Sequence, residues 1–444
     1  LSLKLADKTE DEAKEILIKR YQNQLTRADQ INNEDVFQSY ANALTSQYDP
    51  HTQYFSPRRS ENFQINMSLS LEGIGAVLQA TDDYTVIRSL VAGGPALTSK
   101  QLSEGDRIIG VGQDGKKIVD VIGWRLDDVV QLIKGPKGTK VNLEILPEGN
   151  DSKSHTVTIV RDKIRLEDRA VKSEVIEQDG KKVGVLEVPS FYVGLAEDTK
   201  KQIDELKKQD ISGIIVDLRN NGGGALTEAT ALSGLFITGG PVVQVRDSYG
   251  RVNVNADTDG EISYTGPMTV LVNRYSASAS EIFAAAMQDY KRAIIIGSKQ
   301  TYGKGTVQNV VDLNNVLRSS TAGDLGALAV TTQKYYRING GSVQLEGVKS
   351  DVKVPGRFSY IDVGEKDKEN PLPWDEIDAA NYAVWDSYFD YDKTINKSKE
   401  RMHNNEQLKL IDENAKWVKG KIDETIVSLN YEKYKAENEQ EYYP

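Results

Sequence analysis

Residues 268–297 read MTVLVNRYSASASEIFAAAMQDYKRAIIIG and indicate the fold of the region around them. The two ends of this stretch, 268–273 and 293–297, are short apolar runs of the kind that form buried strands. The segment between them predicts a helix from about residue 279 to residue 289. A strand, a helix and a second strand in this order predict a βαβ unit with parallel strands.

The same pattern occurs upstream in the chain. A strand is expected at 183–188, a helix at 197–206 and a strongly apolar strand at 213–218. Two such units predict an α/β sheet with helices packed on it, and we expect this core to occupy residues 163–358.

Residues 66–162 differ, because their short expected strands are separated by glycines. The loop Gly73-Ile74-Gly75-Ala76 precedes one strand, and a short helix is expected at about 124–133. These elements resemble a PDZ domain, in which such a loop offers backbone N–H groups to the terminal carboxylate of a peptide. We therefore expect Gly73, Ile74, Gly75 and Ala76 to bind peptide, whereas each glycine taken alone would indicate a tight turn.

Charged segments with helical patterning flank these regions, at residues 1–65 and 359–444. The first contains the turn-forming sequence Tyr48-Asp49-Pro50-His51-Thr52, in which His51 is interpreted as part of the turn rather than as a catalytic group. The second carries apolar residues every three or four positions, which predicts one docked helix. These residues are Ile411, Ala415, Val418, Ile422, Ile426 and Leu429.

The composition limits the possible chemistry. The 444 residues are enough for about three domains. A net charge of −11 argues against a nucleic-acid backbone as the principal partner, and no apolar run is long enough to span a membrane. The absence of cysteine excludes a thiol nucleophile and a cysteine-based zinc site. A Ser-His-Asp triad would need His51, His155 or His403, and all three lie outside the expected core.

Three loops at the ends of expected strands carry candidate functional residues. The first, Asp217 to Gly224, places three glycines between a strand and a helix. Exposed N–H groups at such a helix start stabilise an anion, either a phosphate or an oxyanion. The loop lacks the G-x-G-x-x-G spacing of a dinucleotide site.

The second loop is Ser276-Ala277-Ser278-Ala279-Ser280-Glu281. Ser278 followed three residues later by Glu281 fits a helix-capping box, which is the better-supported interpretation on local sequence alone. The same position would also expose Ser278 as a nucleophile at the carboxyl end of a strand. The N–H of Ala279 could then stabilise a developing oxyanion.

The third loop, Tyr302-Gly303-Lys304-Gly305, departs from a Walker A motif in its glycine spacing and in lacking Ser or Thr after the lysine. Lys304 could enter the protein interior, where desolvation lowers the pKa of a lysine and makes it a usable base. A solvated loop lysine is the alternative. Because histidine is so scarce, the three loops together favour a Ser278–Lys304 dyad beside a glycine oxyanion site.

These motifs, in this order, resemble the C-terminal processing peptidases and most closely their tail-specific protease branch. The resemblance covers nearly the whole chain, from the turn at 49–52 to the segment at 303–308. It implies an α+β multidomain fold, with a PDZ domain inserted before an α/β serine-protease core and with helical N- and C-terminal segments.

By this resemblance Ser278 is the nucleophile, Lys304 the general base and Gln308 the residue that orients the lysine. The N–H groups of Ala279 and of Gly222 or Gly223 would form the oxyanion hole. Asp289 also matches a position linked to activity in this branch, although its place near a helix end indicates a structural carboxylate.

The resemblance further implies a serine endopeptidase that recognises the apolar C-terminus of proteins through its PDZ domain and cleaves them through an acyl-enzyme, with no metal or other cofactor. Expected partners are proteins or peptides with free apolar C-termini and an adaptor lipoprotein. The expected location is the bacterial periplasm, with the signal peptide absent from this chain. The alternatives are a catalytically silent PDZ scaffold or chaperone and, with less support, a phosphate-binding NTPase.

Overall fold

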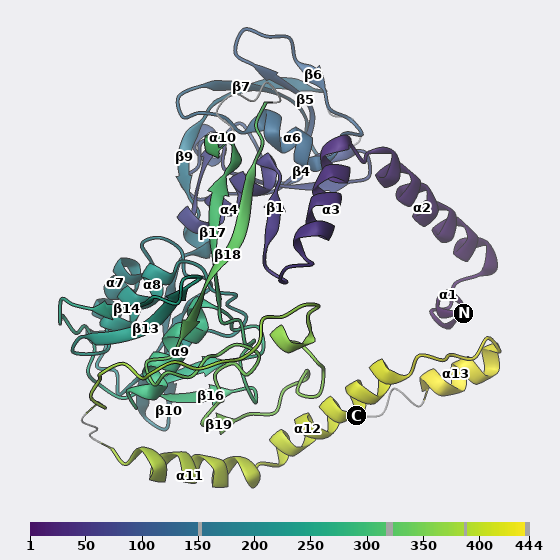
Figure 1. The fold of residues 1–444 in the computed structure, drawn as a ribbon. Helices are drawn as coiled ribbons and strands as arrows, with labels where there is room; N and C mark the ends of the chain where they lie inside the picture. The colour runs from purple at the N-terminus through teal and green to yellow at the C-terminus, as the bar shows by residue number, and fades with distance from the viewer. Residues whose placement is uncertain (150–152, 317–322, 386–388, 440–444) are drawn as a thin grey trace. The chain divides into compact units, whose positions relative to one another are not determined.

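The computed structural model describes residues 1–149, 153–316, 323–385 and 389–439. The chain divides into two compact units (Figure 1). One contains Leu1–Glu61 together with Val171–Pro444, and the other contains Asn62–Ala170. The N-terminal segment therefore belongs to the same unit as the α/β core.

The core of the first unit is a six-stranded sheet whose strands lie side by side in the order in which they occur in the chain. β10 and β11 pair antiparallel, and every other neighbouring pair is parallel, as the two βαβ patterns predict. The strand order is β10 (Lys172–Gln178), β11 (Lys181–Glu187), β12 (Ile214–Asp217), β15 (Met268–Val272), β16 (Ile294–Gly297) and β19 (Val352–Lys353).

Three helices connect or follow these strands: α7 (Leu195–Lys207), α8 (Leu226–Gly234) and α9 (Ala279–Asp289). The predicted helices at 197–206 and 279–289 are thus confirmed to within two residues. Every residue from Ala279 to Met287 is buried. A helix that is buried on all sides lies inside a core, and the polar side chains of α9 that are buried with it, Ser280 and Glu281, are hydrogen-bonded there.

A second, antiparallel sheet joins segments that lie far apart in the sequence. Its order is β1 (Gln53–Phe55), β18 (Ala327–Tyr336), β13 (Gly240–Asp247) and β14 (Val252–Asp257), with β17 (Thr306–Asp312) also paired to β18. β1 lies beside β18 with Tyr54 opposite Leu328 (Figure 1). This pairing places the N-terminal turn near strand β17.

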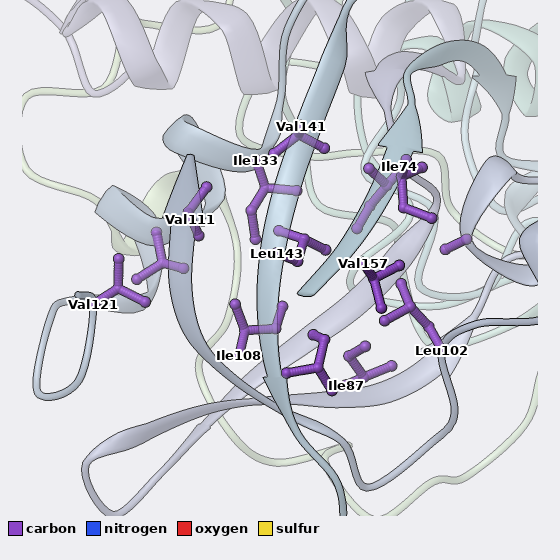
Figure 2. Close-up of a cluster of buried hydrophobic side chains, with 14 residues drawn as sticks. Ile74, Ile87, Leu102, Ile108, Val111, Val121, Ile133, Val141, Leu143 and Val157 are labelled. Carbon is purple, nitrogen blue, oxygen red and sulfur yellow. The ribbon is translucent and has the colours of Figure 1, made fainter. Parts of the chain in front are cut away.

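The second unit contains the predicted small β domain. β2 (Ser70–Gly73) pairs with β9 (Asp162–Arg165), and β3 (Ala76–Thr81) lies at the edge of a sheet. The helix α4 (Pro57–Ser68) precedes these strands in the chain and begins in the first unit. The remaining elements are β4 (Tyr84–Leu90), α5 (Pro95–Ser99), β5 (Arg107–Gln113), β6 (Val119–Asp120), α6 (Leu126–Ile133), β7 (Lys140–Leu146), β8 (His155–Val160) and the 3₁₀ helix η1 (Glu167–Arg169). Figure 2 shows the core of the unit, a cluster of aliphatic side chains that includes Ile87, Ile108 and Leu143.

The helical flanks match the sequence only in part. The N-terminal segment forms α1 (Ser2–Leu5), α2 (Glu10–Asp29) and α3 (Asn33–Thr45), and the latter two begin with capping boxes. The C-terminal segment forms α11 (Tyr391–His403), α12 (Glu406–Asp423) and α13 (Tyr431–Glu439). Short helices also occur at α10 (Leu313–Val316) and at η2 (Glu365–Asp367), a 3₁₀ turn.

Two expectations for the C-terminal region are wrong. In its described part, 359–390 contains no regular helix except η2. The apolar stripe at 411–429 does not form one docked helix, because α12 ends at Asp423 and Ile426 and Leu429 are more than four-fifths exposed. The docked helix is α11, whose Tyr391 and Ile395 pack with residues of β16 and β19. Residues 440–444 lie outside the described part.

Candidate active site

Hydrogen bonds fix the serine turn against the glycine loop. Ser276 Oγ donates to the Leu218 carbonyl at 2.8 Å, and Ser280 Oγ donates to the Asn221 carbonyl at 2.9 Å. The Ala277 N–H also donates to the Asn221 carbonyl, at 3.0 Å. The outer two serines of the Ser-Ala-Ser-Ala-Ser sequence therefore have structural roles, and both are buried.

Ser278, the middle serine, is partly exposed and precedes the first residue of α9. Its backbone has φ +57° and ψ −115°, a conformation that is rare for a residue with a side chain. Strained backbone at the junction of a strand and a helix is typical of nucleophiles held out from a sheet. The expectation that the turn exposes Ser278 agrees with this geometry.

Glu281 joins the serine turn to the lysine loop. Its Oε2 accepts hydrogen bonds from the backbone N–H groups of Ser278, at 2.8 Å, and Lys304, at 3.0 Å. Its Oε1 accepts from Thr301 Oγ1, at 2.6 Å, and from the Gly303 N–H, at 2.7 Å. The sequence showed Glu281 only as part of a helix cap, so its bonds to the lysine loop were missed. Burial raises the pKa of Glu281 to about 7, and the four hydrogen bonds oppose this effect.

Tyr335 of β18 makes a second connection between the same two loops. Its hydroxyl lies 2.5 Å from the Lys304 carbonyl oxygen and 3.1 Å from the Ser278 carbonyl oxygen. The side chain is buried, and burial raises the pKa of the phenol well above its usual value, so it stays a hydrogen-bond donor. No local sequence signal marked Tyr335, because its partners come from two other loops.

Lys304 is partly buried between Gly303 and Gly305. Burial lowers the pKa of its ammonium group below the usual lysine value, in the direction that a general base needs. The nearby charges of Glu365, Glu281 and Asp49 oppose this effect by favouring the protonated form. In the described part of the chain, no hydrogen bond joins the Lys304 ammonium group to the Ser278 hydroxyl.

Gln308 lies on β17, four residues after the lysine. Its Nε2 donates to Thr306 Oγ1 at 2.9 Å and to Thr331 Oγ1 at 3.1 Å. Thr331 Oγ1 in turn donates to Asp49 Oδ1 at 2.8 Å. The side chain of Gln308 is therefore held by threonines, and among the residues described here it has no hydrogen bond to Lys304.

Of the predicted oxyanion residues, Ala279 follows Ser278 in the chain and Gly223 lies against it, and the two glycines are not equivalent. A Cβ atom at Gly223 would be 2.8 Å from the Ser278 Cβ and 3.0 Å from the Ala279 nitrogen, so the glycine loop touches the serine turn directly. The Gly223 N–H already donates to Asn221 Oδ1 at 2.9 Å. At Gly222 the same hypothetical atom meets nothing within 4 Å. Because the Gly223 N–H is already bonded, Gly222 is the better candidate for the second donor.

Asp289 ends α9 and forms an ion pair with Arg337. Its carboxylate lies 2.6 Å from Arg337 Nη2 and accepts a hydrogen bond from Asn339 Nδ2 at 2.9 Å. The Asp289 side chain is only 5% exposed. These contacts agree with the interpretation of Asp289 as a structural carboxylate.

The turn at 49–52 has the expected chemistry and one additional contact. Asp49 Oδ1 accepts hydrogen bonds from the backbone N–H groups of His51 and Thr52, which confirms the turn. The His51 imidazole lies 2.7 Å from Glu365 of η2. A contact across 314 residues has no local sequence signal, so this partner was not predicted.

The predicted peptide-binding loop lies at the start of β3 in the second unit. Gly75 has φ +75°, which favours glycine, and the carbonyls of Ile74 and Gly75 accept hydrogen bonds from Ala96 and Val91. The Ile74 side chain is buried in the core, so only its backbone could contact a peptide. β3 is at the sheet edge and α6 contacts it, an arrangement that allows a peptide strand to add there.

No described helix is both long and apolar enough to cross a membrane. Within the described ranges, no cluster of three or more histidine, aspartate and glutamate side chains could hold a metal ion.

Four family profiles match the chain in succession. They are the tail specific protease N-terminal domain at residues 1–58, a PDZ domain at 62–146, peptidase family S41 at 182–354 and the C-terminal domain of tail specific protease at 358–442. The fold and these matches define a PDZ-containing peptidase.

Individual proteins agree with the profiles. The chain is 48% identical to the tail-specific protease of Haemophilus influenzae over 99% of this chain and 64% of that protein. It is 31% identical to the carboxy-terminal-processing protease of Bartonella bacilliformis over 82% of this chain and 73% of that protein. The crystallised PDZ domain of a Vibrio cholerae carboxy-terminal protease, in complex with a peptide, is 83% identical over 22% of this chain and all of that domain, with a TM-score of 0.22.

The chain belongs to peptidase family S41, the carboxy-terminal processing serine proteases, and within it to the tail-specific branch. It spans less than two thirds of the length of the Haemophilus tail-specific protease.

Proposed function

We propose that this chain is a serine endopeptidase in which Ser278 is the nucleophile and Lys304 the general base. The observation that carries the proposal is the position of Glu281, whose single Oε2 atom accepts hydrogen bonds from the backbone N–H groups of both residues. One buried carboxylate thereby fixes the two reacting loops against each other. The lowered pKa of Lys304 supports its assignment as the base.

The reaction would follow from these roles. Neutral Lys304 takes the proton from Ser278 Oγ, which attacks the carbonyl carbon of a peptide bond. The N–H groups of Ala279 and Gly222 would stabilise the oxyanion, and Gln308 would orient the lysine. When the tetrahedral intermediate collapses, the leaving amine takes the proton from Lys304. Water, activated by the same lysine, then attacks the acyl-enzyme and frees Ser278.

Substrate recognition is assigned to the PDZ domain. The free edge of β3 can accept a peptide as an added strand, and the backbone N–H groups of the loop at 73–76 can bind its terminal carboxylate. The proposed substrates are therefore proteins with free apolar C-termini. The proposed domains are 1–65, 66–162, 163–358 and 359–444.

The proposed location is the bacterial periplasm, and an adaptor lipoprotein is a proposed further partner. Both follow from membership of the tail-specific branch. Fractionation of cells that express the complete protein would test the location.

Cleavage of a test protein with an apolar C-terminal tail tests the activity. We expect the unmodified chain to cleave it, and Ser278→Ala and Lys304→Ala to leave it intact. Equal cleavage by all three would reject the dyad. Binding of the tail without cleavage by any of them would favour the scaffold function instead.

A further inference from the structure

His51 and Glu365 form a buried pair that connects the N-terminal turn to the segment after the α/β core. His51 Nε2 lies 2.7 Å from Glu365 Oε2, and the two side chains are 13% and 0% exposed. A carboxylate removed from water in this way needs hydrogen-bonding partners. His51 is one partner, and Gln344 Nε2, which donates to Glu365 Oε1 at 3.1 Å, is another.

Glu365 is attached to the lysine loop on both sides of Lys304. Its backbone N–H donates to the Tyr302 carbonyl at 2.9 Å. Its partner Gln344 accepts a hydrogen bond from the Gly305 N–H through Oε1 at 2.7 Å. The residues two before and one after Lys304 are therefore connected to Glu365.

Three carboxylates act electrostatically on Lys304: Glu365 from η2, Glu281 from α9 and Asp49 from the N-terminal turn. Glu281 is held by backbone and threonine donors, and Asp49 by backbone and threonine donors of its own. Glu365 differs because one of its hydrogen-bonding partners is the His51 side chain, which comes from the N-terminal turn and can be replaced without a change in the lysine loop. Among the described residues, the phenols of Tyr302 and Tyr335 also interact electrostatically with Glu281 and Glu365, and burial raises the pKa of both phenols.

We propose that the His51–Glu365 pair is a positioning pair for the dyad, which holds the lysine loop and sets the pH at which Lys304 can accept the proton of Ser278. The proposal rests on the proposed function of the dyad. The anion of Glu365 favours the protonated form of Lys304, and the hydrogen bond from His51 maintains that influence because it stabilises the charged form of the buried carboxylate.

Glu365→Gln removes the charge with little change of shape. Neutral Lys304 is the active form, so the acid limb of kcat/KM should move to lower pH, by about one pH unit. His51→Ala should also move it to lower pH, because a buried carboxylate that loses a donor holds its negative charge less well. His51→Gln keeps an N–H donor at a similar reach and should restore most of the original profile. Glu346→Gln, an exposed carboxylate that bonds Lys349, is the matched control and should cause no shift.

The pH profile of tail cleavage is the first measurement. The second is competitive labelling of Lys304 with acetic anhydride across pH in a Ser278→Ala background, which reports the proton affinity of the lysine without cleavage. The proposal would be overturned if the pH profiles of Glu365→Gln and the unmodified chain coincide, or if the profile of Glu365→Gln moves to higher pH. If Glu365→Gln does not fold, a shift of His51→Ala to lower pH and its reversal in His51→Gln decide the question, and a shift of His51→Ala to higher pH would overturn the proposal.

The two measurements separate the two proposals. A labelling shift without any cleavage by the unmodified chain would reject the proposed function and retain the charge effect on Lys304. Cleavage that depends on Ser278 and Lys304, with no shift in either profile, would retain the proposed function and reject the role of His51 and Glu365.

Discussion

The carboxylate of Glu281 lies 2.8 Å from the backbone nitrogen of Ser278, at the start of the helix that follows the serine. The same oxygen accepts the Lys304 N–H, and the other oxygen accepts two further donors. A carboxylate can accept at both oxygens, whereas an amide side chain presents N–H donors on one side.

Glu281→Gln should therefore abolish or severely reduce activity, although the side chain keeps its size. Its amide group would face either the N–H groups of Ser278 and Lys304 or the Thr301 hydroxyl and the Gly303 N–H, and about 1–3 kcal/mol is lost for each buried donor left without an acceptor. We expect kcat to fall at least 100-fold. Cleavage kinetics, with a circular dichroism spectrum to check folding, measure this. Activity close to that of the unmodified chain would show that the four bonds are not needed.

Tyr335→Phe tests the second connection between the loops. The ring packing is retained and only the hydroxyl that lies near the Lys304 and Ser278 carbonyls is lost. We expect kcat to fall about tenfold, with KM little changed, and unfolding to become easier by about 1 kcal/mol. Steady-state kinetics and thermal unfolding check this. A change confined to KM would mean that the hydroxyl acts on substrate binding instead.

Two glycine substitutions distinguish neighbouring positions in the oxyanion loop. Gly223→Ala would place a Cβ 2.7 Å from the Ala277 carbonyl oxygen and 2.8 Å from the Ser278 Cβ, at φ +100°, and should abolish cleavage. Gly222→Ala meets nothing within 4 Å and keeps its N–H, so most activity should remain. Labelling of Ser278 by a fluorophosphonate, compared across the two variants, measures this. Equal labelling rates would contradict the assigned geometry.

Asp289→Asn should act through stability. Arg337 would lose its charged partner and keep the neutral hydrogen bond of its Nη2 to Gln288 Oε1, and breaking a buried ion pair in this way costs about 3–5 kcal/mol. We expect a lower unfolding temperature and a loss of activity that matches the loss of folded protein. Urea unfolding beside cleavage at low temperature tests this. A variant that is fully folded and inactive would show that Asp289 has a direct role in the reaction.

The lowered pKa of Lys304 predicts a pH-dependent difference in stability. A lysine whose pKa is lower in the folded state than in the unfolded state destabilises the fold at pH values below both, and this cost disappears as the pH rises through the two values. Lys304→Met should therefore raise the unfolding temperature at neutral pH, with the gain shrinking as the pH approaches about 10. Thermal unfolding from pH 6 to pH 10 measures it. A gain that grows with pH would contradict the direction of the shift.

Much of the local structure could be predicted from the sequence. The helix at 279–289 and the strands around it have apolar patterns that specify their type without help from distant residues. The turn at 49–52 is similarly local, because Asp49 bonds the two N–H groups that follow it. The prediction of one docked helix from the apolar residues at 411–429 was wrong, because apolar spacing indicates a helical face and does not show what covers it.

The sequence by itself also predicted that Ser278 and Lys304 lie on loops that follow strands of one sheet. Local patterns do not indicate more than this. Only the tertiary structure decided that Glu281 and Tyr335 join these loops, that Gln308 is held by threonines, and that His51 meets Glu365. Hydrogen bonds have a reach of about 3 Å, so which groups pair depends on how strands β17 and β18 and the segment around residue 365 pack. That packing is a property of the whole chain.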